Sequence, residues 1–477
     1  MTEINLIKIK ERPINGATTK LKREALLLKM GGVLFFAFLS ASVLAVERLT
    51  LAEVARRAVA RNPGLRAADA LVDQARRARS EASATHYPRL DAGSAFTRGD
   101  GPVYAFASLL DQRNFTAANF DIGTLNQPGY VTNFKSYLRA GIPIFAGYEI
   151  QSWEKMAGLG LGQAESMAAG ARQDVRLAVL DAGIQTLQAR DLVERLDERI
   201  RASQEEIASA QRLRAKGLVL GSDFFAAQAV LSGLKAWRIQ AGKMAEAGQE
   251  SLGVLLASDP AGFELVGSLR AGGPGLPSLT DLNGLARVNR ADVRASVLEA
   301  ELAEVSAFKE KSTFLPRVDA MAQAETNTED FSSNPSNRLV MVQAQWALGD
   351  PTYLARRKKA IDASRAGRQR QAAIEERARI EILQSLRQYE GAREALPLLA
   401  ETVENAKQSL DLFRPLDREG RQSILDVLRA EEALARADSL RLEALAQLHC
   451  QRARALAAAG ILDEGALGAL SAALEKK

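Results

Sequence analysis

The sequence has little of the chemistry that most enzymes use. Its 477 residues contain one cysteine and two histidines, so an intrachain disulfide, a Cys-x-x-Cys site and a cluster of histidine metal ligands are excluded. It also has no paired carboxylates with converging partners, no Ser/His/Asp set and no phosphate-binding glycine loop at a strand–helix junction. The sequence therefore predicts a protein that is not an enzyme, has no cofactor and holds no metal.

A spread of positive charge typical of nucleic-acid binding is also missing. The formal net charge is +5, but residues 1–45 carry seven basic and three acidic side chains, which is a net +4. The remaining residues hold 56 basic and 55 acidic side chains, which is a net +1. The basic excess belongs to the N-terminus, and we expect no nucleic-acid partner.

Long apolar runs are absent after residue 45, and the one before it is short. Met30–Ala45 is a 16-residue apolar segment that follows the basic stretch Lys20–Lys29 and has small residues at Val43 and Ala45. This pattern predicts a secretory signal peptide over residues 1–45, preferred to a membrane anchor because a spanning helix needs about 20 residues. Residues 1–19 precede an otherwise ordinary signal peptide, as expected if the true start codon lies further along the sequence. The exported chain is then periplasmic, secreted or inserted in a membrane as strands.

What the sequence does contain is an internal repeat. Leu65–Ala92 aligns with Val293–Ala320 at an offset of 228, and Lys216–Ala227 aligns with Glu419–Ala430 at an offset of 203. The first copy therefore carries about 25 extra residues. Composition places them in the loop of residues 98–134 between two strands, because the corresponding loop of the second copy is only about residues 327–336.

Each copy follows the order helix, strand, loop, strand, helix, tight turn, helix. Apolar residues at spacings of three and four predict the helices, and alternation predicts the strands. The predicted ranges are a signal peptide over 1–45; repeat 1 over 46–257, with helix 51–86, strands 89–97 and 136–146, and helices 149–216 and 222–257; a linker over 258–280; repeat 2 over 281–460, with helix 281–314, strands 317–326 and 338–348, and helices 352–419 and 425–460; and a tail over 461–477.

Three local features refine this pattern. Leu180, Ile184, Leu187 and similarly spaced residues predict a coiled-coil seam along the first long helix, which would be about 100 Å long. Pro397 predicts a bend in the second long helix. After the two turns, Ser222-Asp223 and Ser423 with Asp426 predict helix caps.

Aromatic residues are scarce, but they are concentrated near the predicted strands. Of 26 aromatic residues, 11 lie in residues 85–148. Strands of about 9–11 residues with aromatic ends are typical of outer-membrane barrels, whereas a soluble sheet on top of a coiled coil is the alternative. Four strands cannot close a barrel, and open edges are not tolerated in lipid, so insertion requires an oligomer. Two chains would give 8 strands and three would give 12.

The doubled helix–Pro–strand unit, the strand end Ile142–Gly147 and the paired Gly-x5-Asp turns 217–223 and 420–426 resemble the TolC-like outer membrane efflux protein family. The resemblance covers about Leu49 to Leu462. It implies a mainly α fold with membrane β-strands, in which two tandem repeats form a long α-helical barrel. It also implies four strands per chain of a 12-stranded trimeric β-barrel. The protein would be a homotrimer in outer-membrane lipid that extends into the periplasm of a Gram-negative cell.

The resemblance further implies partners and site residues. The trimer would be an exit duct for drug or solute efflux, or for type I secretion. It would contact a periplasmic membrane-fusion adaptor and, indirectly, an inner-membrane pump. The adaptor-docking tip would comprise Gly217, Leu218, Val219, Ser222, Asp223 and Gly420.

The same resemblance implies a pore constriction near the second turn. Asp426 matches its acidic position, where three equivalent carboxylates facing a narrow lumen would repel one another and favour cations. Arg429 stands where the family often has a second acid, and it would instead pair with a neighbouring carboxylate to latch the tip shut. A periplasmic coiled-coil scaffold or adaptor that does not insert in the membrane is the alternative function. The transported substrate is not encoded in these features, because a duct selects little.

Overall fold

The computed structural model describes residues 47–331, 335–419 and 421–475. The predicted signal peptide and Gly420 lie outside the described residues. The chain divides into a small unit, which includes Arg48 and Ala261–Glu264, and a large unit of Leu49–Pro260 and Leu265–Lys477. Strands β1 (Glu47–Leu49) and β4 (Phe263–Leu265) form a two-stranded sheet that the sequence did not predict.

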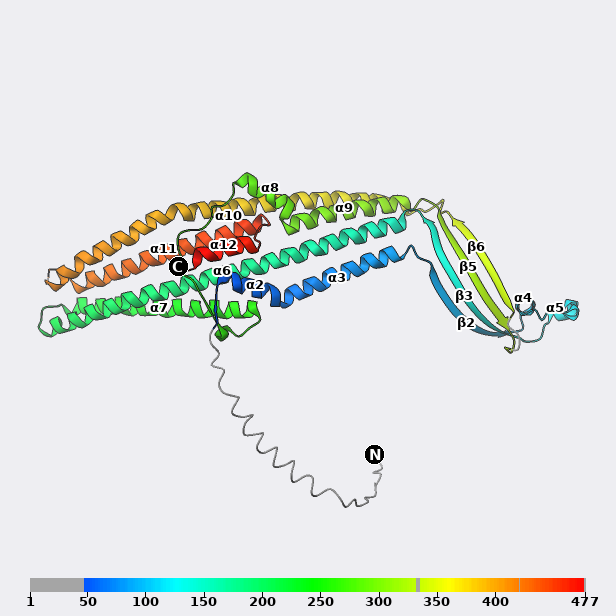
Figure 1. Ribbon diagram of the computed structural model, residues 1–477, viewed down its shortest axis with the longest axis horizontal. Coiled ribbons are helices and arrows are strands. Elements are labelled where there is room, and N and C mark those ends of the chain that lie inside the picture. Colours follow the sequence, from blue (N-terminus) through cyan, green and yellow to red (C-terminus); the bar gives the residue numbers. More distant parts are fainter. Residues whose placement is uncertain (1–46, 332–334, 420, 476–477) are drawn as a thin grey trace, which may run out of the picture. The chain divides into compact units, whose positions relative to one another are not determined.

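Two long helices run through the large unit, one from each repeat (Figure 1). They are α6 (Glu149–Ala215) and α10 (Tyr353–Arg418), with 67 and 66 residues. Each ends in a tight turn that leads back into a shorter helix, α7 (Gly221–Leu256) or α11 (Ile424–Ala458). α10 continues through Pro397 and Pro415 without a break.

The other two short helices were predicted wrongly as single helices over 51–86 and 281–314. In the first repeat the chain forms α2 (Leu51–Arg61) and α3 (Pro63–Ala84), because Pro63 has no N–H to donate and Asn62 caps the new helix. In the second repeat α8 (Leu279–Asn289) and α9 (Ala291–Ser312) meet at Arg290, whose ψ of 124° is not helical. Arg290 lies 228 residues after Asn62, so the break repeats with the sequence.

The insertion of the first repeat is partly helical, and its description as a loop over 98–134 is corrected. It contains α4 (Pro102–Asp111), the short 3-10 helix η1 (Ala117–Phe120) and α5 (Ile122–Asn126). Edge-to-face contacts join the rings of Phe106, Phe115 and Phe120 at 4.9 and 5.1 Å. These ring contacts join α4 to η1 within the insertion, although Phe120 stays 65% exposed.

Two further segments have more structure than predicted. The tail contains α12 (Glu464–Leu474), and the linker contains the 3-10 helix η2 (Pro260–Gly262) before β4. The backbone N–H of Ser268, in the linker, donates to the carbonyl of Leu474 at 2.9 Å. The linker and the tail therefore lie against each other.

The core of the large unit lies between the long helices and their returning partners. Leu180, Ile184, Leu187 and Leu196 of the predicted seam on α6 are almost fully buried. Beside the strands, the helices follow the order α3, α6, α9, α10, and toward the turns α7 and α11 pack on α6 and on each other. Apolar stripes on several helices are thus covered by neighbouring helices, which is the main source of stability for such an arrangement.

A four-stranded antiparallel sheet stands at the end of the helices opposite the turns (Figure 1). Its order is β2 (Arg89–Gly99), β3 (Val131–Ala146), β5 (Arg317–Thr328) and β6 (Ser336–Gln345). β2 pairs with β3 without a shift, whereas the β3–β5 register shifts between Pro143 and Phe145. Proline cannot donate to the ladder, which accounts for an irregularity at this point.

Apart from the gaps named above, no helix within residues 47–475 combines the length and the apolar character needed to span a membrane.

Candidate pore and docking surfaces

The two faces of the four-stranded sheet differ in chemistry. Residues that lie opposite one another in the ladder share a face, so Leu90 and Ala140 lie on the same face as Ile142 and Ala320. Large apolar side chains stand exposed on this face: Leu90, Phe96, Leu138, Ile142, Val340 and Val342. An exposed apolar sheet face of this size indicates contact with lipid or with another protein.

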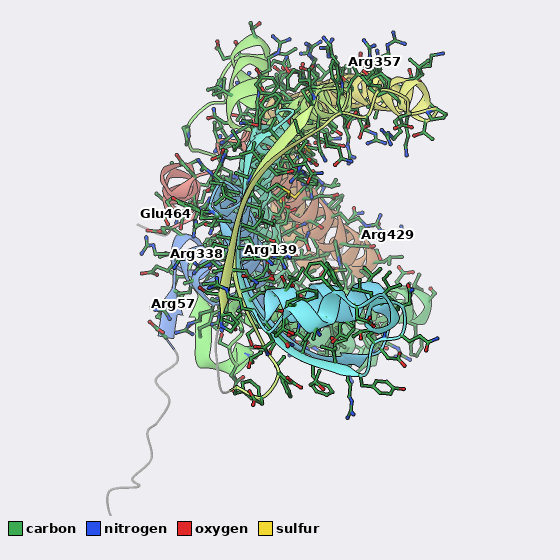
Figure 2. The ribbon with its side chains drawn as sticks, turned by 90° about the vertical axis from the view of Figure 1, so that its right-hand side faces the viewer. Arg57, Arg139, Arg338, Arg357, Arg429 and Glu464 are labelled. Carbon is green, nitrogen blue, oxygen red and sulfur yellow. The ribbon has the colours of Figure 1, made fainter. Side chains whose placement is uncertain are left out.

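The opposite face has a hydrogen-bonded polar centre, beside the exposed Leu339 and Met341 of β6. Lys135 Nζ lies 2.8 Å from Glu325 Oε2, Arg139 donates to Gln323 at 2.9 Å, and the buried amide of Asn133 donates to Asn327 at 2.9 Å. Figure 2 shows Arg139 and Arg338 on opposite sides of the sheet. The sheet thus has the polar-on-one-side, apolar-on-the-other pattern of strands in a membrane barrel.

The edges of the sheet have no partner among the described strands. β2 and β6 each pair with one neighbour only, so each presents a row of unpaired backbone groups. Within a bilayer such edges must be satisfied by further strands. The four described strands alone therefore do not satisfy this requirement.

The first turn at the far end of the helices is apolar on its surface. Gly217 takes a left-handed φ of +76°, and its N–H and that of Leu218 bond back to Arg214 and Leu213 at 2.9 and 3.0 Å. This is the Schellman arrangement that ends a helix at glycine. Leu218 and Leu220 are 71% and 70% exposed, and Val219 is half-buried. The turn therefore presents apolar side chains to solvent.

The second turn has the same backbone pattern but a charged surface. The N–H of Arg421 donates to the carbonyl of Leu416 at 2.9 Å, which repeats the bond from Leu218 to Leu213. Arg421 also lies 3.3 Å from the carboxylate of Glu419 on the exposed side. The two repeats thus share this backbone hydrogen bond but expose different side chains.

A hydrogen bond joins the two turns. Ser423 Oγ donates to Asp223 Oδ2 at 2.8 Å and accepts from the N–H of Leu425 at 3.2 Å, so Ser423 caps α11 as predicted. The cap predicted at Ser222-Asp223 is wrong, because the N-cap of α7 is Leu220 and no side chain bonds there. Asp223 instead accepts from Ser423 and, at 3.2 Å, from Ser222, because the second turn brings a hydroxyl donor within its reach.

Asp426 is held by two neighbours on its own chain. Gln422 Nε2 donates to Asp426 Oδ2 at 2.5 Å, and Arg429 Nη1 lies 4.0 Å from Asp426 Oδ1. Asp426 is half-buried and Arg429 is exposed. Figure 2 shows Arg429 projecting from the surface of α11. The two charges are therefore close enough to offset each other at this surface.

A buried charge cluster lies behind the second turn and was not foreseen from the sequence. Glu431 is fully buried, and its carboxylate lies 2.5 Å from Arg414 and 3.4 Å from Arg199. Arg414 is also 3.8 Å from Glu206. Burial raises the pKa of Glu431 above its ordinary value, and the two arginines oppose that rise. The cluster ties α6, α10 and α11 together close to the tip.

The described part of the chain offers no metal site. His, Cys, Asp and Glu side chains form no group of three that would hold an ion there. His449 and Cys450 are buried in α11, and His449 Nε2 lies 2.8 Å from the carbonyl oxygen of Arg270. Burial raises the pKa of the Cys450 thiol to about 12, so this thiol is unreactive.

Comparison with known proteins agrees with this geometry. A family model described as outer membrane efflux protein matches residues 54–255 and 282–460. Comparison with curated protein sequences gives no match.

Among solved structures, the chain is similar to the outer membrane protein VceC of Vibrio cholerae, with 16% identity, a TM-score of 0.74, and coverage of 86% of this chain and 96% of VceC. It is also similar to the CmeC outer membrane channel of Campylobacter jejuni, with 15% identity, a TM-score of 0.74, and coverage of 89% of this chain and 90% of CmeC. The open-state MtrE outer membrane channel of Neisseria gonorrhoeae is similar too, with 16% identity, a TM-score of 0.72, and coverage of 87% of this chain and 90% of MtrE. At these identities the likeness shows a shared fold.

Proposed function

The chain belongs to the outer membrane efflux protein family, and from this premise we propose that it is a trimeric exit duct. Its fold is that of TolC-like channels, with two tandem repeats, long helices and strands. Membership of a transport family confirms that it is not an enzyme. As a duct, it would pass substrates from an inner-membrane pump and a periplasmic adaptor to the outside, in drug or solute efflux or in type I secretion.

One observation carries this proposal: the four-stranded sheet has an exposed apolar face, a polar face and two unpaired edges. In a Gram-negative outer membrane the apolar face would contact lipid and the polar face would line a channel. Edge β2 of one copy would pair with edge β6 of the next. The TolC-like resemblance implies three copies, which supply twelve strands.

The turns at the other end of the helices would be the periplasmic tip. The exposed apolar side chains of the first turn suit docking of an adaptor, because a pump complex must seal against the duct. We assign this docking surface to Gly217, Leu218, Val219, Ser222, Asp223 and Gly420. Asp426 and Arg429 would face the pore at its narrowest part, where their charges partly cancel.

The test is to express the full chain and follow where it goes and what it conducts. We expect a sarkosyl-insoluble membrane protein whose migration in gels changes with heating, and which forms stable conducting channels in planar bilayers. A soluble, extended rod that gives no conductance would instead identify the periplasmic scaffold and would reject the duct.

A further inference from the structure

The two long helices begin very differently just below the sheet. α6 begins with Glu149, whose negative charge suits a helix N-terminus. α10 has no acid in its first turn, and four consecutive cations, 356–359, end its first seven residues. Cations at this end oppose the helix dipole. The preference for acids over cations at a helix N-terminus is thus kept in α6 and broken in α10. Such a local exception points to a partner that is not part of this chain.

The cations of α10 are mostly unpaired. Arg356 is accounted for, since it lies 2.7 Å from Asp350 and 3.4 Å from Glu310. Arg357, Lys358 and Lys359 are all exposed and form no ion pair with any described residue. Figure 2 shows Arg357 at the outer margin of the ribbon. Three adjacent positive charges thus stand free on the surface.

Apolar side chains share one helix face with Arg357 and Lys358. Leu354 lies four residues before Lys358 and Ile361 three residues after it, so all three fall on one helix face. Leu354 is 65% exposed and Ile361 is 37% exposed. Exposed apolar side chains between cations are typical of a helix surface that contacts the headgroup region of a membrane.

The distance of Arg357, Lys358 and Lys359 from the sheet matches the headgroup region of a membrane. Trp346 directly follows β6, is 55% exposed and donates to the carbonyl of Phe314 at 2.9 Å, as an interfacial tryptophan does. Lys359 lies six residues after the start of α10, which is about 9 Å along the helix. This distance is comparable to the Debye length of about 8 Å at physiological ionic strength.

We propose that Arg357, Lys358 and Lys359 form a binding surface for the anionic phosphate headgroups of phospholipids in the periplasmic leaflet of the outer membrane. This inference rests on the proposed function, because it requires the sheet to be inserted. Pairing of β6 with β2 of a neighbouring copy would also bring α3 beside α10. The partner's α3 would then add Arg79 of the partner subunit, five residues from the sheet end of its helix, at the depth of Lys358.

The test uses the full-length protein in phosphatidylcholine vesicles that contain a pyrene-labelled tracer lipid, either phosphatidylglycerol or phosphatidylcholine. Energy transfer from the protein's tryptophans reports which tracer gathers around it. We expect a preference for phosphatidylglycerol that weakens as the salt concentration rises from about 0.05 to about 0.5 M. The Debye length shortens over this range, so the attraction between the cations and the anionic headgroups is screened. The triple variant Arg357→Gln, Lys358→Gln, Lys359→Gln should lower the preference by at least about fivefold.

A second triple variant, Arg379→Gln, Arg393→Gln, Lys407→Gln, is the matched control. It removes the same charge from exposed positions of α10 farther from the sheet, and it should keep the lipid preference of the unmodified protein. An equal fall in both variants would overturn the proposal, since net charge alone would then explain it. Equal energy transfer from the unmodified protein to both tracer lipids would also overturn the proposal.

Conductance measured on the same vesicles separates the two claims. A protein that conducts but shows no preference for phosphatidylglycerol overturns the lipid site and leaves the duct standing. A protein that neither inserts nor conducts overturns the duct, and the lipid site falls with it. If the triple variant instead loses sedimentation with purified peptidoglycan and keeps its lipid preference, the surface binds the cell wall and the proposal is wrong.

Discussion

The two turns at the tip share a backbone hydrogen bond but differ in the side chains that they expose. Leu218 bonds back to Leu213 at 3.0 Å, and Arg421 bonds back to Leu416 at 2.9 Å. The first turn exposes Leu218, whereas the second exposes an Arg421–Glu419 ion pair. One local hydrogen bond is therefore kept in both repeats, while the side chains at the same places differ. We interpret the apolar turn as the stronger docking element and the charged turn as the pore element.

The difference continues behind the turns. Glu431 is fully buried between Arg414 and Arg199, but the equivalent position of the first repeat, 203 residues earlier, is Gln228, which is exposed. Arg214 instead backs the first turn, with its guanidinium 5.0 Å from the ring centre of Phe224. The first turn rests on apolar packing and the second on buried charges. The second is thus the more sensitive of the two to loss of one partner.

The largest effect is expected at the apolar turn. A Cβ at Gly217 would meet nothing within 4 Å, so Gly217→Arg should fold, with a strain of about 1–2 kcal/mol from its positive φ. It should reduce efflux-dependent resistance to the level of a deletion strain, because the added side chain obstructs docking. Gly284→Arg, on α8 and equally unobstructed, is the control and should keep resistance. Full resistance in the Gly217→Arg strain would reject the docking surface.

The next largest effect is expected behind the charged turn. Glu431→Ala should lower the free energy of unfolding by about 3–5 kcal/mol, because two arginines lose their buried partner. Gln228→Ala, its counterpart in the first repeat, should change it by less than about 0.5 kcal/mol. Denaturant titration of the purified protein measures both. Equal costs at the two positions would show that the repeats are not stabilised differently.

Glu431 also gives the stability a pH dependence. Its pKa is raised in the folded state, so the folded state holds the proton at pH values where the unfolded chain has lost it. The free energy of unfolding should therefore be highest below the unfolded pKa of 4.5 and fall as pH rises through the folded pKa. Glu431→Gln should remove this component. Unchanged pH dependence in that variant would assign the effect to other groups.

A smaller effect is expected on ion selectivity. Asp426→Ala should reduce cation selectivity in planar bilayers, and Arg429→Ala should increase it, because each residue offsets the charge of the other. A unit charge about 4 Å from an ion in water contributes about 1 kcal/mol, which is roughly fivefold in a permeability ratio. Reversal potentials in a salt gradient measure this. Anion selectivity that neither substitution alters would exclude both residues from the constriction.

The smallest effect is expected at the bond that links the turns. In a double-mutant cycle, Asp223→Ala and Ser423→Ala should show a coupling of about 0.5–1.5 kcal/mol, the usual contribution of one hydrogen bond. Ser222→Ala, which removes the neighbouring exposed donor, serves as the comparison. Purely additive costs for Asp223 and Ser423 would mean that the two turns are energetically independent.

The regular elements were predictable because their apolar periodicity is long. The predicted helix 149–216 corresponds to α6, which ends one residue earlier, at Ala215. The predicted ranges missed both breaks in the short helices: Pro63 marks the first, whereas no proline marks the one at Arg290 and only the repeat offset from Asn62 indicates its place. The helices of the insertion were missed because their stability comes from rings that meet in space, such as Phe106 and Phe115. Short segments of this kind carry no periodic signal.

The site was predictable only in part, for a similar reason. Gly217 and Asp426 follow from turn spacing and family resemblance. Glu431 gave no sequence signal, because Arg199 lies 232 residues away and an isolated glutamate in a helix is usually exposed. The bond between Ser423 and Asp223 spans 200 residues and likewise depends on how the two turns meet. Contacts between distant helices decide these features, and local patterns do not encode them.

In the proposed duct, edge β2 of one chain pairs with edge β6 of another until three chains close a ring. Disulfide cross-linking tests it directly, because Ser94→Cys on β2 can be combined in turn with Arg338→Cys, Val340→Cys or Val342→Cys on the same sheet face of β6. Oxidised membranes should give a covalent species of three chains for one of these pairings. Cross-linked species that stop at two chains, or no cross-linking in any register, would exclude a ring of three chains closed by pairing of β2 with β6.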